Sequence, residues 1–593
     1  MGMSFADLQR LRFGGTADAT AISAVILGGI LSSPLALGAG AAGMATTMGL
    51  SAAGGTEIGR RLASAIRLDT FGDEKIKLHI NSSEVPELKP GERGMHLGYV
   101  VDSGKPLIIP MSEWVRHGMI VGQSGVGKTV LAEWLLLQQI ASGGGVLWVD
   151  GKLDSDNLGK LWAMCAWCGR ELDLMVVNPG NPAMSNTYNP SLDGDADEIA
   201  ARYVGMIPTS EGNAGTDFYR QNSTIAITTL VAAIQSLGLA YNFTDIRVLL
   251  TSDRGITTLL NLCQKIGQNG MEYTPEGRAL GLFVDQFRVG GGKGGQPGAI
   301  SMERMRQVFG GLGSRLAQFS QGDFGKVMDT YMPDVRLYDC IRQKKVVYVM
   351  LPTMGKSEAA SALGKLFVND LRSAIARVQK LPKAERPNPP MLNLFDEAAS
   401  FVTQTWGRMF EQSRSARMML LPAFQTKSGM ETIGKELLAM VAGNTTTKAI
   451  FSPGEPETAK WLADIIGKEF QTQYSVSASA AASHKDAAAT ERMRGTVDSD
   501  TRNNNLGYSE SIKEDYKISQ DELMLLDKGE CVVTYQGNRV YHIRVPFVNF
   551  TDEFMREIGP FKVQRGRPHS IDGLNMLDRI AGKRQDAPQE GTF

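Results

Sequence analysis

The sequence predicts an α/β fold whose parallel sheet is interrupted by a helical insertion and preceded by two membrane-crossing helices. Three observations carry this prediction. A short apolar strand runs directly into a loop of the form Gly-x-x-x-x-Gly-Lys-Thr, several other apolar runs end in polar residues, and residues 19–56 contain no charged side chain. Strand, loop and helix in that order are typical of α/β sheets, and a long uncharged run near one end is typical of membrane segments.

Composition sets outer limits. The 593 residues include 62 Lys and Arg against 63 Asp and Glu, and 42% are apolar. These proportions exclude a disordered or fibrous chain and allow several packed cores. The balanced charge provides no overall basic field, so any contact with nucleic acid needs a local patch or an assembled surface. Five scattered cysteines argue against a disulfide framework, and the Cys165–Cys168 pair is expected to be two buried helical thiols.

The uncharged run at 19–56 is too long for one crossing. As a straight helix its 38 residues would reach about 57 Å, against a hydrocarbon core of roughly 30 Å. Two helices with a turn near 32–40 fit better, and arginines on both sides place both ends in the cytoplasm. A secretory signal and a soluble Ala/Gly-rich helical pair remain as alternatives, although export would separate the next motif from ATP.

The glycine-rich loop predicts a nucleotide site. An apolar strand at 115–121 precedes it, and an apolar helix from Val130 to about Ile140 follows. In such a P-loop the backbone N–H groups surround the phosphates, the lysine reaches the β and γ phosphates, and the threonine holds Mg²⁺. The predicted nucleotide-binding residues are Gly122, Gln123, Ser124, Gly125, Val126, Gly127, Lys128 and Thr129.

An ATP-hydrolysing site also needs a carboxylate for the metal and a base for the attacking water. The apolar run 391–395 ends in Asp396 and Glu397, which we expect to hold Mg²⁺ and to activate the water, respectively. A third strand, 418–424, ends at Gln425, a candidate sensor of the γ phosphate. A helix at about 405–415 carries Arg408 and Arg414, with Arg417 just beyond, and an arginine offered by a neighbouring subunit is a strong stabiliser of phosphoryl charge.

The motifs in this order resemble the type IV coupling proteins, the TraG/TraD-type motors of conjugation and type IV secretion. The resemblance rests on His117, Val146-Leu-Trp-Val-Asp-Gly-Lys152, Asn186-Thr-Tyr-Asn-Pro190 and Leu394-Phe-Asp-Glu-Ala398, covers about 95–470, and resumes at 523–530. It implies a RecA-like nucleotide domain, an inserted all-helical domain, a two-helix membrane anchor and a hexameric ring.

The resemblance also bears on individual residues. The family's arginine finger lies eleven residues before the strand-end glutamine, which corresponds to Arg414 here. Ser413 and Arg417 depart from the family's flanking glycines, so the choice between Arg414 and Arg417 stays open. Asp150-Gly-Lys152 departs from the family's Asp-Pro-Lys-Gly, which leaves Asp150 and Lys152 as weak site candidates.

Hydrophobic periodicity and composition predict how the rest of the chain is divided into segments. Helical periodicity without a clear strand runs from about 191 to 333, and 344–351 returns to strand character. The Gly-rich stretch 290–295 follows no buried strand and is expected to be a connector, and 530–543 is expected to form a hairpin. The expected divisions are a cytoplasmic N-terminus 1–18, a transmembrane hairpin 19–56, a juxtamembrane segment 57–94, a nucleotide domain 95–190 and 336–472, an all-α domain 191–335, a mobile insertion 473–515, C-terminal strands 516–558 and a flexible tail 559–593.

These features predict an inner-membrane ATPase, mostly cytoplasmic, that uses ATP and Mg²⁺ to drive single-stranded DNA with an attached relaxase into a type IV secretion channel. The nearest alternative is a receptor or pump for protein effectors without DNA transport, which has the same catalytic motifs. A structural module that only binds nucleotide and a soluble chromosome translocase are more distant alternatives. The helical domain is expected to meet the DNA or its protein escort first.

Overall fold

The computed structural model describes residues 66–70, 80, 82–207, 214–267, 270–290, 298–480, 504–537 and 539–564. The predicted membrane hairpin at 19–56, most of the Gly-rich connector and the tail beyond Gln564 lie outside these residues. Among the described helices, none combines the length and the apolar character that a membrane crossing requires.

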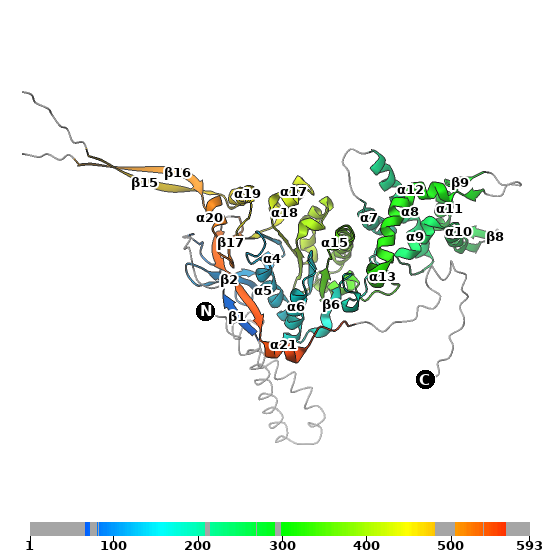
Figure 1. Ribbon diagram of the computed structural model, residues 1–593, viewed down its shortest axis with the longest axis horizontal. Coiled ribbons are helices and arrows are strands. Elements are labelled where there is room, and N and C mark those ends of the chain that lie inside the picture. Colours follow the sequence, from blue (N-terminus) through cyan, green and yellow to red (C-terminus); the bar gives the residue numbers. More distant parts are fainter. Residues whose placement is uncertain are drawn as a thin grey trace, which may run out of the picture.

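A sheet of eleven strands forms the centre of the molecule, in the order β3-β2-β18-β17-β14-β4-β13-β12-β5-β11-β6 (Figure 1). The strands from β14 to β6 are all parallel, and nearly every residue in them is buried. Runs rich in Val, Ile, Leu and Met without alternation are what a parallel sheet covered on both faces requires. These strands are β4 (Gly118–Val121), β5 (Val146–Asp150), β6 (Leu174–Val177), β11 (Val346–Met350), β12 (Met391–Asp396), β13 (Met418–Phe424) and β14 (Thr447–Ile450).

The strand expected at 115–121 is shorter than the sequence suggested. Residues Met111–Trp114 form a short helix, α4, and His117 has a left-handed backbone with φ 66°. That conformation cannot continue a strand, so β4 begins at Gly118. The helix expected at 405–415 is likewise divided, into α16 (Gly407–Gln412) between two 3₁₀ turns at 404–406 and 413–416.

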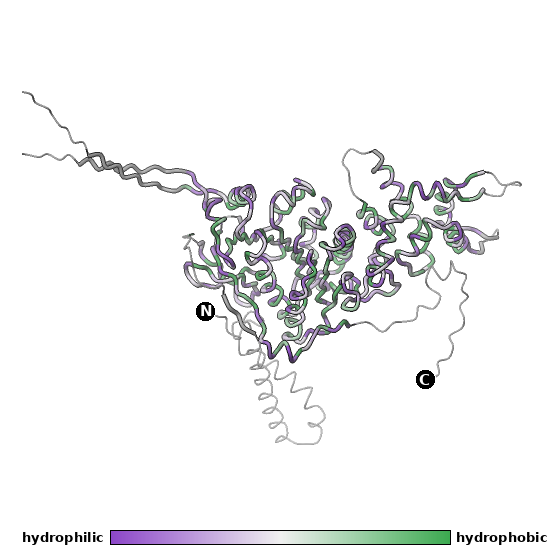
Figure 2. The backbone as a smooth tube through the Cα atoms, viewed as in Figure 1, coloured by the Kyte–Doolittle hydropathy of each residue, from purple (hydrophilic) through white to green (hydrophobic). Residues whose placement is uncertain are grey.

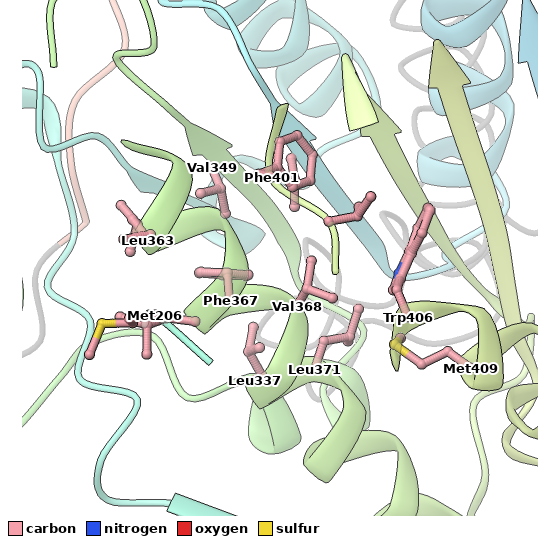
Figure 3. Packing of buried hydrophobic residues seen from close by; sticks show 14 of the residues in the cluster. Met206, Leu337, Val349, Leu363, Phe367, Val368, Leu371, Phe401, Trp406 and Met409 are labelled. Atoms are coloured by element: carbon pink, nitrogen blue, oxygen red, sulfur yellow. The ribbon is translucent and has the colours of Figure 1, made fainter. Parts of the chain in front are cut away.

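Helices cover both faces of the parallel strands. One face packs on α5 (Lys128–Ala141) and α6 (Ser155–Trp167), and the other packs on α15 (Ser357–Gln379), α16 and their neighbours. Figure 3 shows the second layer, where Leu363, Phe367, Val368 and Leu371 of α15 point toward Val349 and Phe401. Figure 2 shows hydrophobic residues along the strands and polar residues on the outer turns.

The remaining helices of the sheet domain follow the connections between strands. Cys165 is buried within α6, and burial raises the pKa of its thiol, as expected for an inert packing residue. No group of three potential metal-binding side chains occurs within the described part of the chain. The remaining helices of the sheet domain are α14 (Leu337–Arg342), α17 (Lys427–Glu431), α18 (Lys435–Asn444), α19 (Pro456–Ile466), α20 (Gln520–Met524) and α21 (Asp552–Ile558).

Strands from the two ends of the chain extend the sheet on one side. The predicted hairpin forms from β17 (Glu530–Tyr535) and β18 (Arg539–Arg544), and Glu530 binds both His542 (3.0 Å) and Arg544 (2.8 Å). β2 (Gly94–Val100) pairs with β18, and β3 (Pro106–Pro110) pairs with β2 at the edge of the sheet. A separate pair joins β1 (Ile66–Thr70), in the expected juxtamembrane segment, to β19 (Pro546–Phe550).

The residues between β6 and β11 are mainly helical, but they do not form the all-α domain expected at 191–335. They include two small antiparallel ribbons, β7 with β8 and β9 with β10, which single-sequence periodicity missed because these strands have two to four residues each. The elements of this helical domain are α7 (Ala196–Val204), α8 (Ala214–Ser236), α9 (Phe243–Thr251), α10 (Asp253–Leu262), β7 (Gln264–Gly267), β8 (Gly270–Tyr273), α11 (Pro275–Asp285), β9 (Arg288–Val289), β10 (Ala299–Ile300), α12 (Met302–Ser320) and α13 (Gly322–Met328).

The two segments that connect the sheet domain to the helical domain lie side by side and are bonded to each other. Tyr188 and Val335 form a parallel bridge, and Asn189 donates to the carbonyl oxygens of Tyr241 (3.0 Å) and Thr330 (2.7 Å). The Asn186–Pro190 motif of the sequence therefore joins the two domains through backbone and side-chain hydrogen bonds.

The insertion expected at 473–515 begins and ends in regular structure. Strands β15 (Lys468–Ala480) and β16 (Asn504–Tyr516) pair antiparallel and extend away from the body as a long ribbon (Figure 1). Its Ser- and Asn-rich composition indicated a loop, whereas the backbone pairs in register from Lys468–Tyr516 to Ala480–Asn504.

The packing of α15 yields a stability prediction. Phe367 is fully buried, and its ring lies 4.6 Å from that of Tyr188. Phe367→Ala should lower the free energy of unfolding by about 3–5 kcal/mol, because it removes buried contacts and leaves a cavity. Phe218→Ala, at a side chain that is 53% exposed, serves as the control and should change stability by less than about 0.5 kcal/mol. Urea unfolding measures both, and equal losses would contradict the assignment of Phe367 to the core.

Candidate nucleotide site

The predicted site residues meet at the carboxyl edge of the parallel strands. Gly122 follows β4, Asp396 and Glu397 end β12, and Gln425 follows β13. Strands β4, β13 and β12 are neighbours in the sheet, so their ends lie side by side. Ligands bind at this edge of open α/β sheets.

The P-loop has the backbone that its sequence demands. Gly122, Gly125 and Gly127 have φ values of 158°, 80° and 120°, and the last two are conformations that favour glycine. Lys128 begins α5 and folds back over the loop, donating to the carbonyl oxygens of Gly122 (2.7 Å) and Gln123 (2.8 Å). Burial lowers the pKa of Lys128, while the charges of Glu397 and Asp396 oppose that shift. The lysine is thus held over the loop by carbonyl groups that phosphate oxygens can replace.

The back of the P-loop is built from segments that sequence reasoning did not assign to the site. A Cβ atom at Gly122 would lie 2.6 Å from Cβ of Phe451, and one at Gly127 would lie 3.3 Å from Cα of Gly529. Gly529 also donates its N–H to the carbonyl of Val126 (2.9 Å). The only signal in the sequence was the returning family resemblance at 523–530, which gave no role to these residues.

Asp396 and Thr129 fit a magnesium ion by their chemistry. A hydroxyl at the start of α5 and a carboxylate at the end of β12 are the hard oxygen donors that Mg²⁺ prefers. Asp396 is 5% exposed, and burial followed by the negative charge of Glu397 raises its pKa. A cation beside this carboxylate offsets both effects.

Glu397 is held by two donors on a single oxygen. Its Oε1 accepts from Gln425 Nε2 at 2.7 Å and from Lys152 Nζ at 2.9 Å. Burial alone would raise the pKa of Glu397, but the bonds from Lys152 and Gln425 and the nearby lysine charges lower it overall. Its backbone is left-handed, with φ 55°, which turns the chain sharply after β12. Gln425, the candidate sensor of the γ phosphate, therefore contacts Glu397 directly.

Asp150 and Lys152, the weak candidates of the sequence, both lie in the site. Asp150 is paired in register with Asp396 across β5 and β12. Burial and the charge of Asp396 raise the pKa of Asp150 to about 7, against hydrogen bonds from Tyr348 (2.7 Å) and Asn157 (3.2 Å). The sequence did show an acid at a strand end, but it did not show which strands are neighbours.

The arginines lie at the other edge of the sheet. Arg414 lies in the 3₁₀ turn at 413–416, shortly before β13, whose seven residues span about 20 Å before Gln425. Arg414 is exposed and makes no ion pair with any residue that the structure describes, whereas Arg417 is left-handed and donates to Asn388 (3.1 Å). Arg408 is exposed on α16. These arginines are therefore far from the P-loop of their own chain.

His117 connects the P-loop strand to the arginine-bearing segment. Its Nδ1 accepts from the N–H of Leu420 (3.2 Å), so Nε2 carries the proton and donates to the carbonyl of Phe410 (3.0 Å). Burial lowers the pKa of His117 to about 4, and the positive charge of Arg414 adds to that effect against the bond to Phe410. The folded protein thus holds a neutral imidazole here.

A glycine-rich loop between a parallel strand and a helix, with a strand-end Asp-Glu pair beside it, defines a protein of the P-loop nucleoside-triphosphatase class. Residues 390–528 match a family model described as the TraM recognition site of TraD and TraG. The type 4 coupling protein DotL of Legionella pneumophila is 23% identical over 445 residues, which are 65% of this chain and 54% of that protein. The match thus spans about half the length of this curated relative. In these residues the chain is similar to the type IV coupling proteins.

Several solved structures are similar to this chain at low identity. The conjugative coupling protein TrwBΔN70 is 13% identical with a TM-score of 0.49, over 80% of this chain and 91% of that one. TrwB in complex with ADP and Mg²⁺ is 12% identical with a TM-score of 0.48, over 77% and 90% of the two chains. VirB4 of Thermoanaerobacter pseudethanolicus is 14% identical with a TM-score of 0.43, over 80% and 100%.

The environment of His117 predicts a pH dependence of stability. In the unfolded chain its pKa returns to 6.5, so between pH 6.5 and about 4 the unfolded chain binds more protons than the folded one. Falling pH through this window should cost up to about 3 kcal/mol of stability, with no contribution above pH 6.5.

The variant His117→Asn isolates this contribution. Asparagine tolerates the left-handed backbone and keeps an acceptor for Leu420, but it does not titrate. Urea unfolding at pH 7 and pH 5 should show that the variant loses less free energy of unfolding between these pH values than the parent protein does. All other titrating groups are common to both proteins. Equal losses would contradict a neutral buried His117.

Proposed function

We propose that this protein is a membrane-anchored, hexameric ATPase that couples ATP hydrolysis to recruitment and movement of single-stranded DNA, with its attached relaxase, into a type IV secretion channel. The observation that carries the proposal is the convergence at one sheet edge of Lys128, Asp396, Glu397 and Gln425, from three separate strand ends. The similarity to TraD, TraG and DotL supports the secretion role.

The chemistry follows from the side chains. The P-loop amides and Lys128 bind the phosphates, and Thr129 and Asp396 hold Mg²⁺, which when bound neutralises charge on the β and γ phosphates. Glu397 orients the attacking water and accepts its proton, because it is a half-buried carboxylate whose lowered pKa keeps it ionised. Gln425, bonded to Glu397, is placed to respond to the γ phosphate.

The position of Arg414 supports an active site shared between chains. It is exposed at the edge of the sheet away from its own P-loop, so it can reach a nucleotide only in a neighbouring subunit. A head-to-tail contact that repeats and closes forms a ring. Hexameric rings are what the family resemblance implies, and a ring also lets a nearly neutral chain line a pore with basic side chains.

The location and partners are part of the same proposal. We assign the uncharged run 19–56 to an anchor in the bacterial inner membrane, with the bulk of the chain cytoplasmic and in contact with the secretion channel. Arginines on both sides of that run support this orientation.

One observation favours the alternative of a receptor or pump for protein effectors. Between residues 191 and 335, Asp and Glu outnumber Lys and Arg by fifteen to twelve, so the helical domain has no excess of positive charge for a phosphate backbone. Stimulation of ATP turnover by single-stranded DNA supports the DNA motor, and stimulation by a secreted protein alone supports the alternative.

Substitutions of Lys128 and Glu397 should affect ATP binding and ATP turnover differently. Lys128→Ala should abolish ATP turnover by removing the phosphate contact, with weaker ATP binding. Glu397→Gln should still bind ATP but lower turnover by roughly 10²-fold or more, because the base is lost. Steady-state hydrolysis and retention of labelled ATP on the detergent-purified protein measure both, and substantial turnover by Glu397→Gln would exclude it as the base.

Mixing two inactive variants tests the shared site. Lys128→Ala and Arg414→Ala chains should each be inactive as rings, but random 1:1 assembly restores the pairing of an intact P-loop with an intact arginine at about a quarter of the interfaces. ATP turnover of the mixed rings should therefore recover to about a quarter of the parent rate. Arg417→Asn, which suits the left-handed backbone, is the control and should stay active. Inactivity of Arg417→Asn with an active Arg414→Ala would reverse the assignment.

A further inference from the structure

Lys152 contacts the catalytic carboxylate without being part of the P-loop machinery. Its ammonium lies 2.9 Å from Oε1 of Glu397, the same oxygen that accepts from Gln425. The Lys152 side chain is 49% exposed, whereas that of Glu397 is 17% exposed. The lysine therefore holds Glu397 from the solvent side, and it can leave into water at little cost.

The short segment that carries Lys152 is fixed closely against Glu397. A Cβ atom at Gly151 would lie 2.9 Å from Cβ of Glu397, so only glycine allows this approach without a shift. Gly151 donates its N–H to the carbonyl of Asp396 (3.3 Å). A proline at this position, as in the family's pattern, has no such N–H. Movement at Gly151 therefore changes the distance between Lys152 and Glu397.

A second segment contacts Gly151 from the next strand. The hydroxyl of Thr353 donates to the carbonyl of Gly151, and the N–H of Leu351 donates to the carbonyl of Asp150 (2.9 Å). Thr353 belongs to residues 351–356, which connect β11 to α15 and which we call the β11–α15 loop. Met354 in this loop is fully exposed, so part of the loop has no packing to hold it.

The far end of the β11–α15 loop contacts the helical domain. Lys356 binds Asp323 at 3.2 Å and lies over the ring of Phe324 at 5.6 Å, both on α13. Next to it, Glu358 of α15 binds Arg315 of α12 at 3.1 Å. An open groove lined by α12, α13 and the start of α15 lies beside these pairs, so exposed ion pairs hold this outer part of the junction.

We propose that Lys152 is a positioning residue that restrains Glu397, and that the β11–α15 loop couples release of this restraint to the helical domain. A carboxylate oxygen occupied by two donors is a poor acceptor for a proton from water. Displacement of the helical domain pulls the loop through Lys356, moves Gly151 through Thr353, and draws Lys152 away from Glu397. The restraint is the two-state element that such coupling requires. The role assigned to Glu397 rests on the proposed function, whereas the contacts of Lys152 and Thr353 do not.

Hydrogen exchange of the nucleotide-free, full-length protein tests the restraint without turnover. Lys152→Met removes the charge and keeps the apolar stem, and it should raise amide exchange at residues 351–356 and 396–400 severalfold. Lys152→Arg keeps a donor and should match the parent protein. Thr353→Val removes only the hydroxyl and should raise exchange at 151–153. Unchanged exchange in both Lys152→Met and Thr353→Val would overturn the proposal.

Turnover then separates a restraint from a phosphate ligand. Lys152→Met should raise unstimulated kcat severalfold with KM nearly unchanged, and Lys152→Arg should restore the parent values. A lower kcat with a higher KM in Lys152→Met would instead make Lys152 a ligand of the nucleotide. If the parent protein hydrolyses no ATP, the proposed function fails, and the exchange comparison still decides the restraint.

A matched pair of lysines tests the route to the helical domain. Lys356 and Lys326 both bind Asp323 at 3.2 Å, but only Lys356 belongs to the β11–α15 loop. Lys356→Met should abolish stimulation of turnover by single-stranded DNA or a secreted protein and raise exchange at 151–153, whereas Lys326→Met should keep both parent properties. Equal effects of the two variants would overturn the loop as the coupling route.

Discussion

Asp396 lies directly opposite Asp150 because β12 and β5 pair in parallel, with Leu392 beside Val146 and four further pairs in the same register. A shift of one residue would move every side chain of the strand to the other face. The register therefore decides that two buried carboxylates end adjacent strands, that their charges oppose each other, and that Lys128 and Lys152 lie close enough to offset them. The electrostatics of the site follow from this pairing.

The helical domain is placed by the same sheet. It is inserted between β6 and β11, which are neighbours, so both of its connections leave from one region and can be joined by the Tyr188–Val335 bridge. Asp370 of α15 binds both Tyr188 (2.8 Å) and Arg202 (3.2 Å) deep in the junction. The junction thus has buried polar contacts of Asp370 on one side and exposed ion pairs on the other. This difference favours rotation of the helical domain about the buried contacts.

Local patterns in the sequence were sufficient for the strands that carry the site. The apolar runs at 146–150, 391–396 and 418–424 are strands as expected, because a strand buried on both faces shows itself by composition alone. The P-loop and the Asp-Glu pair were identifiable because their glycines and carboxylates have no simpler structural purpose at those places.

What could not be predicted depends on contacts between distant residues. The association of Lys152 with Glu397, the support of the P-loop by Gly529 and the left-handed turn at His117 arise only when strands separated by hundreds of residues become neighbours. The β15–β16 ribbon was missed for another reason: its strands are Ser- and Asn-rich, and pairing over thirteen residues stabilises a backbone that composition does not favour. The resemblance to a family indicated which motifs mattered, but not which atoms meet.

The contact between Gly529 and Val126 sets an order of events during synthesis of the chain. A ribosome adds about 5–20 residues per second, so the P-loop emerges roughly 20–80 seconds before its supporting glycine. Throughout that interval β2 lacks β18, its partner from the end of the chain, and β14 lacks β17 from the time that β14 itself is made. The growing chain therefore presents unpaired strand edges and an unsupported phosphate loop until β17 and β18 are made.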